Sequence, residues 1–207
     1  MPKVMSIDAV FREIQSLVGS LEGARLIGID GFGVSGKSTL AAGLAPLFHA
    51  AVVHTDEFYK PSVQQPATRE YPGEFFDLER LQTAVLKPVR AGAAVRYQIY
   101  DWDRDVMGDW VEIAAGRPVI VEGVYSTEAC LRDLYDLRIF CVAGYEVRLQ
   151  RGLERDSEAA RSTWEHEWMP AEQNYVDLQR PDLAADIILQ GESFGDSLTF
   201  TFQETWQ

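Results

Sequence analysis

The stretch RLIGIDGFGVSGKSTLAAGL, residues 25–44, decides the fold class of this chain. Its apolar start breaks at Gly31, and Lys37 opens an Ala/Leu-rich segment that is typical of a helix. The spacing G-x-x-x-x-G-K-S over residues 31–38 lets backbone N–H groups surround an anion at the positive end of that helix. The stretch therefore predicts a strand, a loop that binds a polyphosphate, and a helix. The alternative is a glycine-rich turn with an unrelated lysine.

Side chains and backbone of this loop have separate expected roles. Lys37 is expected to act in catalysis by reaching the outer phosphates, and the Ser38 hydroxyl to bind Mg²⁺. The loop residues expected to bind the nucleotide are Gly31, Gly33, Val34, Ser35, Gly36, Lys37, Ser38 and Thr39.

The charge balance restricts the partners and the compartment. The 207 residues include 19 basic and 32 acidic side chains, for a formal net charge of −13. Such a chain repels a nucleic-acid backbone or an anionic membrane, so we expect neither as a partner. No signal peptide or long apolar run is visible, and Cys130 and Cys141 suggest reduced thiols, so we expect a cytoplasmic protein. A homo-oligomer is compatible with the sequence but not indicated by it.

Short apolar strands alternate with helical segments along the chain. Ser6 is the expected N-cap of a helix within residues 1–24. Further strands are expected at residues 51–55, 118–123, 137–142 and 185–189. This order predicts one α/β domain, residues 1–207, with a mainly parallel five-stranded sheet and helices on both faces. The tail, residues 198–206, alternates apolar and polar side chains and is expected to be an edge strand.

Two carboxylates follow predicted strands. Asp56 comes directly after the strand at 51–55, and Glu122 ends the strand at 118–123. Because ligands of such sheets bind beyond the carboxyl ends of the strands, both should face the phosphate-binding loop. There we expect Glu122 to bind Mg²⁺ with Ser38, and Asp56 to accept a hydrogen bond from an acceptor hydroxyl. The alternatives are a helix N-cap for Asp56 and a turn residue for Glu122.

Residues 145–180 look helical and highly charged. Arg148, Arg151 and Arg155 recur at intervals of three and four, so they share one helix face. Together with Arg161 they fit a lid, residues 145–165, that closes on a transferring phosphoryl group and excludes water. Arg151 is expected to bind the nucleotide. The alternative is pairing with neighbouring acidic residues, namely Glu146, Glu154, Asp156 and Glu158.

Six motifs occur together in this chain. Besides the phosphate-binding loop they are HTDEFYKP at 54–61, YDW at 100–102, VEG at 121–123, RLQRGLERD at 148–156 and PDLAADII at 181–188. Over residues 25–190 their order resembles the uridine kinase and phosphoribulokinase-like family of P-loop kinases. The resemblance implies a P-loop NTPase fold and ATP-dependent phosphorylation of a small-molecule hydroxyl. It also implies that Asp56 is the acceptor-side base and that Arg155 acts on the phosphates.

Other parts of the sequence differ from the uridine kinase pattern. Uridine kinases have DHPDAFD where this chain has EYPGEFFD at 70–77, and Arg-Gly-Arg where it has ARS at 160–162. The His-x-Arg that follows their Tyr-Asp-aromatic motif is replaced by DRD at 103–105, and DEFYKP is similar to nicotinamide riboside kinases. The acceptor therefore stays open between a nucleoside and another metabolite such as a sugar, a riboside or a pantothenate-like compound.

Aromatic side chains are the candidates for holding the acceptor. We expect Tyr59, Tyr100 and Trp102 from an acceptor-side insert, residues 60–115 with the turn before it, to contact the acceptor along with Arg161. The alternative for the aromatic residues is a place in the core. His54 and His166 are expected to be structural, because neither has a metal-ligand companion at the right spacing.

Two other classes of protein stay open. A P-loop ATPase or GTPase switch would hydrolyse its nucleotide without an acceptor, although the base-reading motif Asn-Lys-x-Asp is absent from the sequence. A regulatory protein with a decayed acceptor site would bind the nucleotide without turnover.

Overall fold

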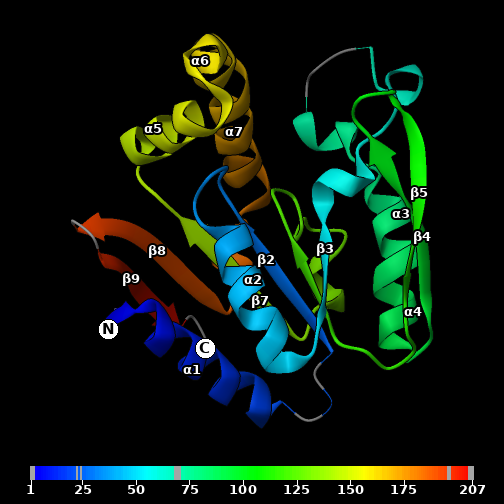
Figure 1. The fold of residues 1–207 in the computed structure, drawn as a ribbon, viewed down its shortest axis with the longest axis vertical. Coiled ribbons are helices and arrows are strands. Elements are labelled where there is room, and N and C mark those ends of the chain that lie inside the picture. Colours follow the sequence, from blue (N-terminus) through cyan, green and yellow to red (C-terminus); the bar gives the residue numbers. More distant parts are fainter. Residues whose placement is uncertain (1–2, 22, 24, 68–70, 195–196, 205–207) are drawn as a thin grey trace.

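A seven-stranded sheet forms the centre of the computed structural model, which describes residues 3–21, 23, 25–67, 71–194 and 197–204. Its strand order is β1-β9-β8-β7-β2-β6-β3 (Figure 1). Five neighbouring strands are parallel: β8 (Ile187–Phe194), β7 (Leu137–Val142), β2 (Leu26–Gly31), β6 (Val119–Glu122) and β3 (Ala51–His54). These strands confirm the predicted parallel sheet.

The chain ends extend this sheet in the antiparallel sense. β9 (Ser197–Glu204) pairs with β8 on one side and with β1 (Lys3–Ser6) on the other. The prediction of a strand in the tail is confirmed, but its place at the edge is wrong, because β1 covers the outer side of β9. The pairing of Lys3 with Phe202 joins opposite ends of the chain. The four residues of β1 are too short a segment for their sequence to predict this pairing. Residues 205 and 206 of the predicted strand lie outside the described residues.

Helices cover both faces of the sheet. α1 (Ile7–Ser20) begins at the predicted N-cap Ser6, whose hydroxyl accepts the Ala9 N–H at 3.4 Å. It packs with α2 (Lys37–Phe48) on one face, where apolar residues of both helices join those of the strands in one core cluster. The other face is covered by the continuous helical segment α3 (Leu78–Leu81), a π-helical turn (Gln82–Leu86) and α4 (Lys87–Arg90).

Two parts of the chain stand outside the sheet, one at its β3 side and one beyond the carboxyl ends of the parallel strands (Figure 1). The first is a separate hairpin of β4 (Val95–Asp101) and β5 (Val106–Ile113) beside α3 and α4. The other is a helical segment that consists of α5 (Tyr145–Asp156), the short α6 (Arg161–Thr163), a π-helical turn (Trp164–Trp168) and α7 (Met169–Gln179). A short helix, α8 (Pro181–Ala184), leads from α7 to β8. None of the described helices is long and apolar enough to cross a membrane.

Candidate active site

The loop between β2 and α2 has the backbone geometry of an anion-binding turn. Gly31 has φ of +133° and Gly36, the N-cap of α2, has φ of +103°, which glycine adopts without strain. A Cβ at Gly31 would lie 2.0 Å from the carbonyl oxygen of Cys141 on β7, so this position also needs glycine for close packing. Lys37 is buried and its Nζ donates to the carbonyl oxygen of Phe32 at 2.7 Å. The lysine therefore lies folded back inside its own loop.

Glu122 at the end of β6 lies beside the start of α2. Its Oε1 accepts the Ser38 hydroxyl at 3.1 Å and is 2.5 Å from Nδ1 of His54. Burial raises the pKa of Glu122, but the hydrogen bond with His54 and the charge of Lys37 outweigh this effect and leave the pKa below its usual range. Glu122 is therefore an ionised carboxylate next to a hydroxyl, which are the oxygen ligands that Mg²⁺ prefers.

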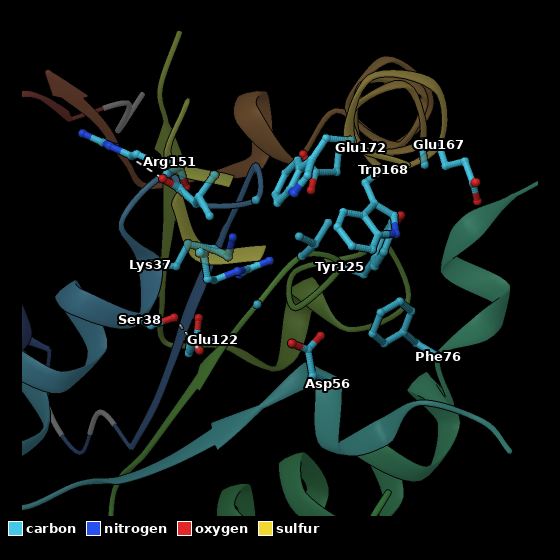
Figure 2. Close-up of a pocket in the computed structure, with 18 of the residues that line it drawn as sticks. Lys37, Ser38, Asp56, Phe76, Glu122, Tyr125, Arg151, Glu167, Trp168 and Glu172 are labelled. Atoms are coloured by element: carbon cyan, nitrogen blue, oxygen red, sulfur yellow. Dashed lines mark hydrogen bonds between the residues drawn. The ribbon is translucent and has the colours of Figure 1, made fainter. Parts of the chain in front are cut away.

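Asp56 lies in the 3₁₀ turn Thr55–Phe58 that follows β3. His54 is the N-cap of this turn, and its N–H is bonded by the Glu57 carboxylate at 3.4 Å, so the Asp56 carboxylate does not cap the turn. Burial raises the pKa of Asp56, while the charge of Lys37 opposes the shift. Figure 2 shows Asp56 across an open space from Lys37.

One cavity of about 1120 Å³ connects these groups. Its phosphate-loop end is formed by residues 33–39 with Glu122, Arg151 and Arg155. Its aromatic end consists of Tyr59, Phe75, Phe76, Trp102, Tyr125 and Trp168. Asp56 also lines the cavity, and in Figure 2 Phe76, Tyr125 and Trp168 gather on the side opposite Ser38 and Glu122. The carboxyl ends of the strands have thus brought the two sequence-predicted carboxylates to the phosphate-binding loop.

Three predicted site residues lie outside the cavity lining. Gly31 is packed against β7 behind the loop. Tyr100 directs its hydroxyl to Asp105 at 2.7 Å, and its ring packs against Trp102 with 4.9 Å between ring centroids. Arg161 forms ion pairs with Glu158 and with Glu165, the latter at 3.2 Å.

The arginines of α5 have separate surroundings. Arg148 is buried, lies over the Phe32 ring and pairs with Glu172 of α7 at 3.0 Å. Arg151 donates to the carbonyl oxygen of Val34 at 3.3 Å, in the phosphate-binding loop. Arg155 pairs with its neighbour Asp156 at 2.8 Å and faces the cavity. Arg155 and Arg161 therefore form ion pairs with neighbouring acidic residues, which was the alternative to a lid over the phosphates. Arg148 pairs instead with a distant residue of α7.

Sequence reasoning missed several residues of this site. Trp164 lines the cavity from the end of the predicted lid, and Trp168 and Glu172 line it from the segment that follows. Burial raises the pKa of Glu172, and the charge of Lys37 opposes the shift. Asp30 stands inside the quoted stretch and is completely buried directly before the loop. Asp30 could have been recognised from the sequence, because a carboxylate in an otherwise apolar strand is unusual. The sequence around Glu172 does not distinguish it from the other acidic residues of its segment.

The donor set fits a nucleotide polyphosphate with Mg²⁺. Within the described residues, the buried Ser35 hydroxyl has no hydrogen-bond partner, and it belongs to the loop that lines the cavity. No three His, Cys, Asp or Glu side chains of the described ranges come together as a metal site. Mg²⁺ is commonly held by one or two protein oxygens plus phosphates and water, so Ser38 and Glu122 would be sufficient protein ligands for it.

The strand, phosphate-binding loop and helix, together with the parallel sheet, define a P-loop NTPase fold. Residues 26–193 match the model of the Phosphoribulokinase / Uridine kinase family, and the chain belongs to this family. This finding confirms the resemblance read from the six motifs.

Individual relatives agree with the family. A uridine kinase of Lactococcus lactis subsp. cremoris (strain MG1363) is 31% identical over 145 residues, which cover 64% of this chain and 69% of that protein. Uridine-cytidine kinase-like 1 of Mus musculus is 30% identical over 148 residues, which cover 65% of this chain but 27% of the mouse protein. The structure of a possible uridine kinase from Bacillus stearothermophilus superposes with a TM-score of 0.67 at 20% identity, covering 89% of this chain and 99% of that one, which supports the fold. The family and its curated uridine kinase relatives are kinases.

Proposed function

We propose that this protein is an ATP-dependent kinase that transfers the γ-phosphoryl group to a hydroxyl of a small molecule. The observation that carries the proposal is that one cavity has a phosphate-loop end, an aromatic end and the Asp56 carboxylate. An ATPase also needs a phosphate-loop end and a group that orients the attacking water, but it needs no aromatic end to hold an acceptor. The proposal takes the chain as one cytoplasmic domain with an acceptor-side insert at 60–115 and a lid at 145–165.

The residues at the phosphate-loop end would bind the nucleotide. Backbone N–H groups of residues 33–39 surround the phosphates, and Lys37 and Arg155 place positive charge on the transferring group. Arg151 would hold the loop and the nucleotide together from α5. Ser38 and Glu122 would bind Mg²⁺, which neutralises charge on the outer phosphates when bound.

Asp56 would act on the acceptor hydroxyl. A buried carboxylate orients a hydroxyl by accepting its hydrogen bond, and it takes the proton as the new P–O bond forms. Because the transition state of phosphoryl transfer is loose, orientation contributes more than deprotonation.

The aromatic end supports an acceptor that carries a planar ring, as a nucleoside or another riboside does. Trp102 is 58% exposed and Trp168 is 41% exposed, although both line the cavity, so a bound ring would bury apolar surface of both. Tyr59 lies 4.6 Å from Trp102 between ring centroids and would fix its orientation. Tyr100, which packs against Trp102 outside the cavity, would help to hold the Tyr59 and Trp102 rings in place. Contact of Arg161 with the acceptor stays a prediction, and so does a non-nucleoside acceptor such as a sugar or a pantothenate-like compound.

The experiment is ADP release with ATP and Mg²⁺, first alone and then with uridine, cytidine, nicotinamide riboside, pantothenate and fructose. We expect slow release alone and strong stimulation by a ring-bearing acceptor. Fast release without any acceptor would support a P-loop ATPase instead. ATP binding without turnover on the whole panel would support a regulatory nucleotide-binding protein.

A further inference from the structure

One face of α7 contacts the first half of the phosphate-binding loop at two points. Glu172 and Tyr175 are three residues apart, so they share a helix face, and both are buried. The Tyr175 hydroxyl donates to Oδ2 of Asp30 at 2.6 Å, and the Glu172 carboxylate lies against the backbone of Gly33 with its Oε1 facing that residue. These contacts lie on either side of Gly31, where the loop leaves β2.

Asp30 is a buried junction of three parts of the chain. Its carboxylate accepts the Gly31 N–H at 2.6 Å, the N–H and hydroxyl of Thr127 at 2.8 Å each, and the Tyr175 hydroxyl. Thr127 belongs to the segment after β6, and Tyr175 to α7. Four donors to one carboxylate fix the exit of β2 relative to both neighbours.

Glu172 holds the next residues of the loop. A Cβ at Gly33 would lie 2.5 Å from Oε1 of Glu172 and 3.2 Å from the Trp164 ring, so the α7 side of the loop is closely packed. The same carboxylate pairs with Arg148, whose guanidinium stacks 4.2 Å from the Phe32 ring centroid. Residues 30–33 are therefore enclosed by side chains of α5, the π-helical turn and α7. Figure 2 shows Glu172 above the loop that carries Lys37.

A glycine-rich loop needs such external contacts to keep one shape. Glycine has access to more backbone conformations than other residues, so the loop loses entropy when it is ordered. Contacts that order it before the ligand arrives raise affinity, because binding no longer bears that entropic cost. The packing of Glu172 against Gly33 orders the first half of the loop. Residues 36–39 are ordered in another way, because they form the N-cap and the first turn of α2.

We propose that Glu172 and Tyr175 are positioning residues that hold residues 30–33 in the shape that receives a nucleotide's phosphates, without touching the nucleotide. The helix that follows the lid then sets the nucleotide affinity of the loop. This inference rests on the proposed nucleotide binding at the same loop.

The test is calorimetric titration of Mg·ADP into wild type, Glu172→Ala, Glu172→Gln and Tyr175→Phe, each well below its unfolding temperature. We expect Glu172→Ala to weaken ADP binding about tenfold, and Tyr175→Phe about threefold because Asp30 keeps three donors. Glu172→Gln should recover most of the affinity, because glutamine has nearly the same size and its amide oxygen can take the same place beside Gly33. Asp177→Ala is the matched control, since this exposed carboxylate of α7 bonds to Gln173 and not to the loop.

Three outcomes would overturn the inference. Wild-type affinity in both Glu172→Ala and Tyr175→Phe, with lowered unfolding temperatures alone, would make the two residues merely structural. Tighter ADP binding in Glu172→Ala would mean that the carboxylate opposes the phosphates. If Glu172→Ala does not fold, then wild-type affinity in Tyr175→Phe decides against the proposal. A wild-type protein that binds no ADP would instead refute the proposed function.

Discussion

The phosphate-loop end and the aromatic end of the cavity are built in different ways. The first comes mainly from the consecutive residues 33–39, and much of what it offers is backbone N–H, which every residue except proline has. The second takes its rings from separate segments, among them the turn after β3, the end of β4 and the π-helical turn before α7. The comparison teaches that a phosphate can be recognised by a local spacing, whereas the acceptor pocket depends on how distant segments are brought together.

The strongest way to break this comparison is to remove the lysine of the phosphate-loop end. Lys37→Ala should lower turnover about 10³-fold, because Arg155 would then be the remaining side chain that places positive charge on the transferring phosphoryl group. The measurement is kcat for ADP release with the best acceptor of the panel. Lys87→Ala, an exposed lysine on α4, is the control and should behave as wild type. Equal turnover in both variants would show that the loop does not handle outer phosphates.

Asp56 lies between the two ends, and its removal should affect chemistry without affecting nucleotide binding. We expect Asp56→Asn to lower kcat about 10²-fold, with an unchanged Kd for Mg·ADP. The neutral amide orients the acceptor hydroxyl by a weaker hydrogen bond than the carboxylate does, and it cannot take the proton. Glu57→Gln is the control, since Glu57 bonds to Tyr97 at 2.7 Å and does not line the cavity. Near-wild-type turnover would remove Asp56 from the mechanism.

Gly33 tests whether the shape of the phosphate-loop end depends on its neighbours. Gly33→Ala should weaken Mg·ADP binding about tenfold, because the added methyl group would collide with Glu172 and Trp164 and shift the loop, at a cost of about 1–3 kcal/mol. Titration calorimetry measures the change. Gly144→Ala is matched, since no atom lies within 4 Å of its added Cβ. Unchanged affinity in Gly33→Ala would mean that the loop adapts without loss.

The aromatic end should respond with the smallest effect, confined to the acceptor. Trp102→Ala should raise KM for a ring-bearing acceptor about fivefold and leave KM for ATP unchanged, because one stacking contact is lost. Trp110→Ala on the same hairpin is the control: this indole is also exposed, but it stacks against Arg96 outside the cavity. A rise in KM for ATP, or no change for any acceptor, would count against an acceptor role of Trp102.

Some positions in the structure could be predicted from local sequence patterns, and others could not. The helix start at Ser6 and the placement of Asp56 and Glu122 were predictable, because capping and strand ends are set by nearby residues and by the parallel order. Arg148 looked like one of a row over the phosphates, yet it is buried against Glu172, which lies 24 residues further on. Tyr100 and Trp102 alternate in one run, but only Trp102 lines the cavity.

The sequence by itself determined the phosphate-binding loop, the five parallel strands and the two carboxylates at their ends. Each of these depends on spacing within one segment or on a rule that all parallel sheets obey. Only the tertiary structure decided that β1 pairs with β9, that Asp30 joins β2 to α7, and that Glu172 packs against the loop. Such contacts form between residues far apart in the chain, and their geometry follows from how whole helices pack on the sheet.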